Sequence, residues 1–214
     1  YRQLSAQASS AAASWCWGSE REMSSTAVSG DGREVWKTTD SPDYSMALGS
    51  AVFPGEGVFE WSVKLSGSHH GVAIGVVTGL DKSELGRSAW RKARSGSKAA
   101  WYIRGTGEVA QLRRGAEYAT TVAEASSANN LTALDFITLR LDCDMRTLRF
   151  FKPDGTELGS CSGLEGELLP FVCFDNVNSK ASLLKTCCLS EGAIELVSSS
   201  DFDFESALQK SLWP

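Results

Sequence analysis

Short runs in which apolar and polar residues alternate recur along most of the chain, and clusters of Gly, Asp and Ser separate them. Alternation with a period of two is typical of a β-strand that has one buried face. In the run 57–65 it places Phe59, Trp61, Val63 and Leu65 on a single face. The pattern predicts strands at 24–28, 34–38, 46–52, 57–65, 71–78, 99–104, 136–142, 147–152, 169–174, 181–187 and 193–197.

These runs follow one another with turns between them and without intervening helical segments, which predicts an all-β, two-sheet antiparallel β-sandwich. The run 147–152 ends at Pro153-Asp154-Gly155, after which 156–158 resumes the alternation. An Asp-Gly pair between two such runs predicts a β-hairpin. A type I′ turn is expected there, with positive φ at both central residues.

Helical periodicity appears only at the two ends of the chain. Phe204, Leu208 and Leu212 recur at every fourth position after Ser200, a favoured N-cap residue, which predicts a short helix packed on the sandwich. A weaker apolar stripe ends at Trp15 and predicts a second short helix. The expected parts are an N-terminal extension at 1–23, the sandwich at 24–197 and the C-terminal helix at 198–214.

The composition is that of a globular protein rich in turns, and it argues against two kinds of partner. Of the 214 residues 42% are hydrophobic, which is too apolar for a disordered chain. The net charge of −5 argues against a nucleic-acid partner, because binding phosphates requires a basic patch. No stretch of 18 apolar residues occurs, so we expect no membrane partner either.

The cysteines indicate buried thiols rather than a metal site or a disulfide framework. No Cys-x-x-Cys pair is present, only two histidines could assist, and we expect no metal and no cofactor. Two of the cysteines are adjacent and several lie in apolar runs, which favours reduced thiols in an intracellular protein. The six are Cys16, Cys143, Cys161, Cys173, Cys187 and Cys188.

Three short patterns resemble reactive or metal sites, but each lacks the context that its chemistry needs. The glycine pattern at 105–110 would need a βαβ unit to bind a dinucleotide. The segment 159–163, with Cys161 at its centre, would need a helix directly after it to form a nucleophile elbow. The calcium-like start at 142–144 has Arg146 where a third ligand is required. We therefore expect no catalytic activity.

Six motifs follow one another along the predicted strands. They are Gly30-Asp31-Gly32-Arg33-Glu34-Val35, Gly57-Val58-Phe59-Glu60-Trp61-Ser62-Val63, Gly71-Val72-Ala73-Ile74-Gly75-Val76, Ala100-Trp101-Tyr102-Ile103 after Leu85-Gly86, Leu139-Arg140-Leu141-Asp142 with 147–155, and Leu169-Pro170-Phe171-Val172. In this order, over about residues 24–184, they resemble a SPRY domain, the β-sandwich module also found within B30.2 domains. Phe59 replaces the usual Trp and Asp154 the usual Asn, and the loops at 81–99 and 115–134 are longer.

The resemblance implies a concanavalin-like sandwich that is a non-catalytic protein-interaction module. Such a module is part of a larger intracellular eukaryotic protein, in the cytoplasm or nucleus, and binds a short peptide or a partner domain through loops at one end. As an isolated domain it is expected to be a monomer. The contact residues carried over from the family's loop positions are His69, His70, Leu80, Phe174, Asp175, Asn176 and Val177. Trp36 and Tyr44 are added because large aromatics near loops are frequent binding anchors.

Other interpretations stay open at this point. Phe174 and Val177 could instead belong to the core. A carbohydrate-binding, lectin-like sandwich has the same architecture, and secretion or disulfides would favour it. An enzyme that uses Cys161 is a third class.

Overall fold

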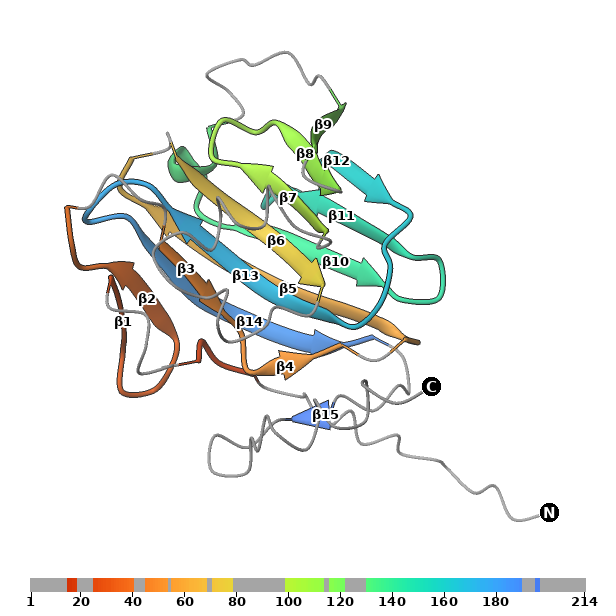
Figure 1. Ribbon diagram of the computed structural model, residues 1–214, viewed down its shortest axis with the longest axis horizontal. Coiled ribbons are helices and arrows are strands. Elements are labelled where there is room, and N and C mark those ends of the chain that lie inside the picture. The colour runs from red at the N-terminus through yellow and green to blue at the C-terminus, as the bar shows by residue number, and fades with distance from the viewer. Residues whose placement is uncertain are drawn as a thin grey trace.

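Two antiparallel β-sheets lie face to face in the computed structural model (Figure 1). The structure describes residues 15–18, 25–40, 45–53, 55–68, 71–78, 99–113, 116–121, 130–189 and 195–196. Within these ranges the helical structure is one 3₁₀ turn, η3 (Leu131–Ala133), and no helix is long and apolar enough to cross a membrane. The predicted all-β sandwich is confirmed.

One sheet has seven strands, in the order β1-β2-β14-β5-β10-β11-β12, and every neighbouring pair is antiparallel. Its strands are β1 (Thr26–Val28), β2 (Glu34–Lys37), β14 (Lys180–Cys188), β5 (Val58–Ser66), β10 (Ile137–Asp142), β11 (Thr147–Phe151) and β12 (Glu157–Ser162).

The other sheet has six strands, in the order β3-β13-β6-β7-β8-β9. They are β3 (Ser45–Leu48), β13 (Leu168–Phe174), β6 (Val72–Thr78), β7 (Ala100–Arg104), β8 (Val109–Arg113) and β9 (Ala116–Thr121). A two-stranded ribbon pairs β4 (Ala51–Val52) with β15 (Glu195–Leu196).

The main core lies between the two sheets and follows the alternation of the strands. In β5, Phe59, Trp61, Val63 and Leu65 are at most 1% exposed, which confirms the face predicted from the sequence. The ring of Trp61 stacks on that of Phe53, with centroids 5.2 Å apart. An aromatic layer of this kind contributes both buried area and specific ring geometry.

Residues 15–18 also belong to the core, although they lie in the predicted N-terminal extension. Trp17 forms an isolated β-bridge with Gly49, and the backbone N–H of Trp17 donates to the carbonyl of Gly32 at 2.8 Å. The rings of Trp15 and Trp17 meet edge to face at 5.1 Å, and both are at most 3% exposed. No helix is assigned to these residues, and the core therefore takes in residues ahead of position 24. The rest of the predicted N-terminal helix and the predicted C-terminal helix lie outside the described residues.

Residues on the opposite face of the six-stranded sheet form a second buried cluster. Val77, Tyr102, Phe171 and Cys173 are all fully buried there, while their neighbours along each strand face the main core. This sheet is therefore apolar on both faces. The seven-stranded sheet instead carries charged residues on its outer face, such as the ion pair of Arg140 with Glu60.

Some strands depart from the alternation. β8 and β9 are not among the predicted strands, and β9 occupies part of the loop expected at 115–134. Both contain small or polar residues that give weak alternation. The strand predicted at 46–52 is divided into β3 and β4 at Gly49, whose N–H donates to the carbonyl of Pro170.

The Asp-Gly hairpin between β11 and β12 is confirmed, but its turn type was predicted wrongly. Among the described residues other than glycine, only Arg146 and Asn178 have positive φ, so Asp154 does not. Gly155 has a φ of 84° and donates to the carbonyl of Lys152. Pro153 favours the first central position of a type I turn, and glycine in the left-handed region then closes a three-residue loop.

Candidate ligand-binding end of the sandwich

The connections β5–β6 and β13–β14 meet at one end of the sandwich, at the upper left of Figure 1 where β6 and β14 begin. The backbone N–H of Asp175 donates to the carbonyl of Gly71 at 2.7 Å. A Cβ atom on Gly71 would overlap the Cβ of Asp175, and Gly71 has a φ of 74°. Glycine therefore permits both the turn into β6 and the close approach of the two connections.

The β13–β14 connection forms a tight turn. The N–H of Ser179 donates to the carbonyl of Asn176 at 3.3 Å, and Asn178 adopts a left-handed φ of 67°. Asparagine tolerates that conformation better than most residues. Asn178 is exposed, whereas Asp175, Asn176 and Val177 are half-buried. The turn thus displays amide side chains from a defined backbone.

Buried polar groups link β1, β2 and β3 to this turn. The Ser45 hydroxyl donates to that of Ser25 at 2.8 Å, and both serines are at most 6% exposed. The Lys37 ammonium donates to the Asp175 carbonyl at 2.5 Å, and the Lys37 N–H donates to the Ser179 carbonyl at 3.2 Å. The hydroxyl of Ser179 is buried without a hydrogen-bond partner.

The β7–β8 turn and η3 complete the same end. The Gly105 N–H donates to the carbonyl of Val72, and the Leu131 N–H donates to the carbonyl of Gly105. The ion pair of Arg104 with Glu108, at 2.6 Å, closes the base of the β7–β8 turn. Several connections that are distant in sequence therefore lie together and present polar groups.

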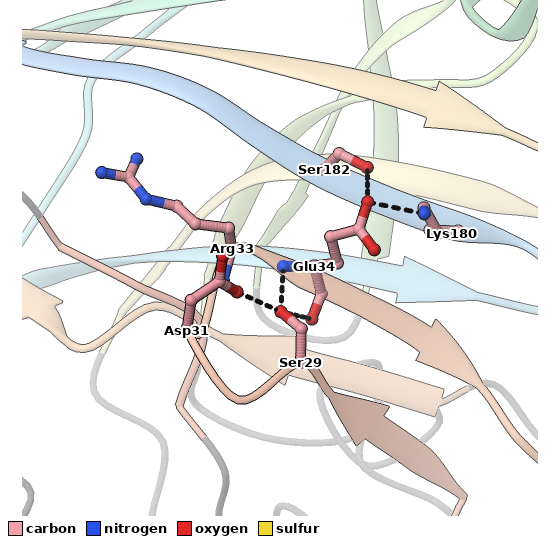
Figure 2. Close-up of polar contacts among 6 residues, drawn as sticks. All are labelled: Ser29, Asp31, Arg33, Glu34, Lys180 and Ser182. Atoms are coloured by element: carbon pink, nitrogen blue, oxygen red, sulfur yellow. Dashed lines mark hydrogen bonds and ion pairs between the residues drawn. The ribbon is translucent and has the colours of Figure 1, made fainter.

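The strand that carries Lys37 is tied to β14 by the side chain of Glu34, as Figure 2 shows. The Glu34 carboxylate accepts from the Lys180 ammonium at 2.6 Å and from the Ser182 hydroxyl at 3.0 Å. These two hydrogen bonds lower the pKa of the Glu34 carboxyl. β2 pairs with β14 over only three residues, so this bridge strengthens a short contact.

Comparison with solved structures identifies the architecture. The SPRY domain of human HERC1 is 21% identical to this chain, with a TM-score of 0.53 over 80% of this chain and 99% of that domain. The TRIM65 PSpry domain is 14% identical, with a TM-score of 0.55 over 79% of this chain and 91% of that one. The chain has a SPRY-like fold.

The structure of stonustoxin is also similar to this chain, at 16% identity and a TM-score of 0.54 over 79% of this chain and 27% of the toxin chain. Neither a protein-family model nor a curated protein matches the sequence. At these identities the structural likeness establishes the fold, and the ligand has to be argued from the site itself.

The predicted contact residues are distributed unevenly over the SPRY-like sandwich. Asp175, Asn176 and Val177 lie in the half-exposed turn, beside Gly71. Phe174 is fully buried in the main core, which agrees with the alternative that this residue is a core residue rather than a ligand contact. The remaining predicted contacts of the loops, His69, His70, Leu80 and Tyr44, lie outside the residues that the structure describes.

Trp36 lies within β2 rather than in a loop. It is half-buried on the outer face of the seven-stranded sheet, opposite Ala27 on one side and Lys180 on the other. Because Lys180 begins β14 next to the β13–β14 turn, Trp36 flanks the candidate end of the SPRY-like sandwich from its side.

Sequence reasoning missed Lys37 and Gly71 as parts of this end. Lys37 is two positions from the buried Val35, so the alternation itself places it on the inner face. A lysine at an inward position is rare unless it is hydrogen-bonded, and that mismatch was the available signal. Gly71 was part of a strand motif, and its contact with Asp175 depends on pairing that is not local in sequence.

The described residues were expected to hold no metal site, and they include Cys161, the centre of the pattern that resembles a nucleophile elbow. No group of three or more His, Cys, Asp or Glu side chains that could hold a metal occurs in that part of the chain. Cys161 is 1% exposed inside β12, and its thiol faces the carbonyl of Ala110 at 3.7 Å. A strand rather than a helix surrounds this thiol, so the geometry of a nucleophile elbow is not formed.

Proposed function

We propose that this chain is a non-catalytic protein-interaction module, which holds a short peptide or a partner domain at the end of the sandwich around Gly71 and Asp175. The contact between Gly71 and Asp175 supports this proposal, because Gly71 directly follows His69 and His70 in the sequence and Asp175 begins the β13–β14 turn. Loops on a rigid two-sheet scaffold can vary without loss of the core, so binding residues are commonly found there.

The groups available at this end suit an extended peptide. The exposed amide of Asn178 can donate to and accept from a peptide backbone, Asn176 is proposed as a contact in the same turn, and His69 and His70 lie next to Gly71 in sequence. Trp36 and Tyr44 are proposed as flanking apolar contacts, because aromatic side chains supply much of the affinity in protein interfaces.

We further propose an intracellular location, in the cytoplasm or nucleus of a eukaryotic cell, for the larger protein of which this module is a part. All six cysteines are free thiols in the structure, which is typical of proteins in a reducing compartment. The same observation disfavours the lectin-like alternative, since secreted domains of this kind commonly contain disulfides.

Selection of peptides tests this function. A random peptide library displayed on phage is panned against the 214-residue chain, and the affinity of an enriched peptide is measured by calorimetry. Replacing His69, His70 and Asn176 together by Ala is expected to weaken binding at least about tenfold, because the three side chains together are proposed to supply several hydrogen bonds and contacts to the peptide. The melting temperature of this variant is expected to change little.

A substitution at the opposite end is the matched control. Met145 is 70% exposed in the β10–β11 turn, and Met145→Ala is expected to bind the peptide as the parent does. Unchanged affinity of the triple variant would move the binding surface to another face. A library that yields no peptide, together with binding on a glycan array, would favour the carbohydrate-binding alternative.

A further inference from the structure

Lys37 is a charged residue with almost no contact with water. Its side chain is 1% exposed and points between the sheets, like Val35 two positions earlier in β2. Removing an ammonium group from water is costly unless hydrogen bonds replace its hydration. The location of its hydrogen-bond partners therefore indicates what this lysine does.

Two contacts of Lys37 bracket the β13–β14 turn. The ammonium donates to the carbonyl of Asp175, the first residue after β13, at 2.5 Å. The backbone N–H donates to the carbonyl of Ser179, the last residue before β14, at 3.2 Å. A single residue of a neighbouring strand thus holds both ends of the turn.

These contacts also cross from one sheet to the other. β13 belongs to the six-stranded sheet and β14 to the seven-stranded sheet, so the turn between them spans the sandwich at its end. The Asp175 N–H donates onward to the carbonyl of Gly71 in the β5–β6 connection. Fixing Asp175 therefore fixes the relative position of the two connections.

We propose that Lys37 is a positioning residue, which sets the geometry of the β13–β14 turn for ligand binding and, through Asp175, its position against Gly71. The expected effect on ligand binding rests on the proposed function, whereas the expected effect on the geometry of the turn does not. Holding a binding loop in its bound conformation before the ligand arrives reduces the ordering cost of association. Lys37 thus contributes to affinity without touching the ligand.

A purely structural role for Lys37 makes a different prediction. If the ammonium only stabilised the sandwich as a whole, its removal would lower the stability of every part of the fold equally, and amides in the turn and in β7 would exchange faster to the same extent. A positioning role instead predicts that Lys37→Met releases the turn while the remainder of the sandwich stays folded. Local order and global stability can therefore be separated by experiment.

Hydrogen exchange measured by NMR is the first test. In Lys37→Met the amides of Asp175 and Ser179 are expected to exchange at least about tenfold faster, because the Asp175 carbonyl loses the hydrogen bond from the ammonium. Amides in β7, such as that of Ile103, are expected to keep their rates. Lys180→Met is the matched control, because it removes an ammonium on the outer face, 37% exposed, and leaves both Lys37 contacts in place.

Peptide binding is the second test. The peptide selected on the parent chain is expected to bind Lys37→Met about tenfold more weakly, through loss of preorganisation. Lys37→Arg, which keeps the charge and the donors, is expected to restore part of both the exchange protection and the affinity. If Lys37→Met does not fold, Lys37→Gln is used, because its side chain is one bond shorter and polar.

Two outcomes would overturn the proposal. Exchange that accelerates equally in the turn and in β7 would make Lys37 an ordinary stabilising residue. Exchange at Asp175 and Ser179 that stays at the parent rate would show that the turn does not depend on the ammonium. Both of these exchange results are obtained without a peptide. A failure of the proposed function is detected separately, by unchanged peptide affinity of the variant in which His69, His70 and Asn176 are replaced by Ala.

Discussion

At the scale of single residues, close backbone contacts impose the strictest requirements in this sandwich. Gly75 lies in the middle of β6, opposite Tyr102 of β7. A Cβ atom on Gly75 would overlap the carbonyl oxygen of Trp101 and lie 2.7 Å from the Cα of Tyr102. Backbone atoms in the centre of a sheet cannot move aside as a flexible side chain can, so the position excludes even a methyl group.

Gly75→Ala is therefore expected to destabilise the protein by about 1–3 kcal/mol, the usual cost of overpacking. Unfolding in urea measures this loss. Gly30→Ala is the matched control, because a Cβ atom there has no neighbour within 4 Å, and it is expected to change stability little. Equal stabilities for the two variants would show that β6 and β7 can separate without cost.

At the scale of elements, β5 is the strand on which the core depends. It pairs with β10 on one side and with β14 on the other, and its inner face carries Trp61. That indole stacks on Phe53 and meets Trp15 edge to face at 6.1 Å. The strand thus joins the seven-stranded sheet to the aromatic layer.

Trp61→Ala is expected to destabilise the protein by about 3–5 kcal/mol, as large-to-small changes of buried aromatics do. Chemical denaturation measures this change. The indole Nε1 of Trp61 is buried without a hydrogen-bond partner, so Trp61→Phe is expected to lose much less. A loss below about 1 kcal/mol for Trp61→Ala would contradict the burial of this face.

Elements with strong local patterns could be predicted from the sequence, and those defined by distant contacts could not. The alternation in β5 gives the buried face of Phe59, Trp61, Val63 and Leu65 correctly, because period-two burial is a local property. β9 has Tyr118 as its single large aromatic residue and lies at a sheet edge, so its pairing with β8 is what reveals it.

The candidate end of the sandwich shows the same limit. Asn176 and Val177 could be placed in a loop from the sequence, because they follow a strand that was predicted. The contribution of Lys37 could not, because it depends on a partner 138 positions away in the chain. Such long-range contacts arise only once both sheets are assembled.

At the scale of the whole molecule, the cysteines divide by burial. Cys143, Cys161 and Cys173 are buried, and Cys16, Cys187 and Cys188 are half-buried. Burial is the main cause that raises the pKa of Cys143 to about 11, and burial also raises the pKa of Cys173. The thiolate is the reactive form of cysteine, so these two thiols are protected chemically as well as sterically.

Titration with a thiol reagent is expected to find six thiols in the unfolded, unreduced protein. In the native protein at pH 8 we expect Cys143 and Cys173 to stay unlabelled. Labelling of Cys143 is expected to accelerate as the pH rises towards its pKa of about 11, because the thiolate fraction then grows. Mass spectrometry of the labelled peptides identifies each site. Fewer than six thiols after unfolding would indicate a disulfide and favour a secreted protein.

The strand order has a consequence for the synthesis of this protein. β14 lies between β2 and β5, although both of those strands leave the ribosome long before it does. Until β14 emerges, the edges of β2 and β5 that will face it have no strand to pair with. The same holds for the edges of β3 and β6 until β13 emerges. Unpaired edges invite association with other chains, and non-local sheets form slowly. The nascent chain is therefore expected to depend on chaperones until both late strands have been translated.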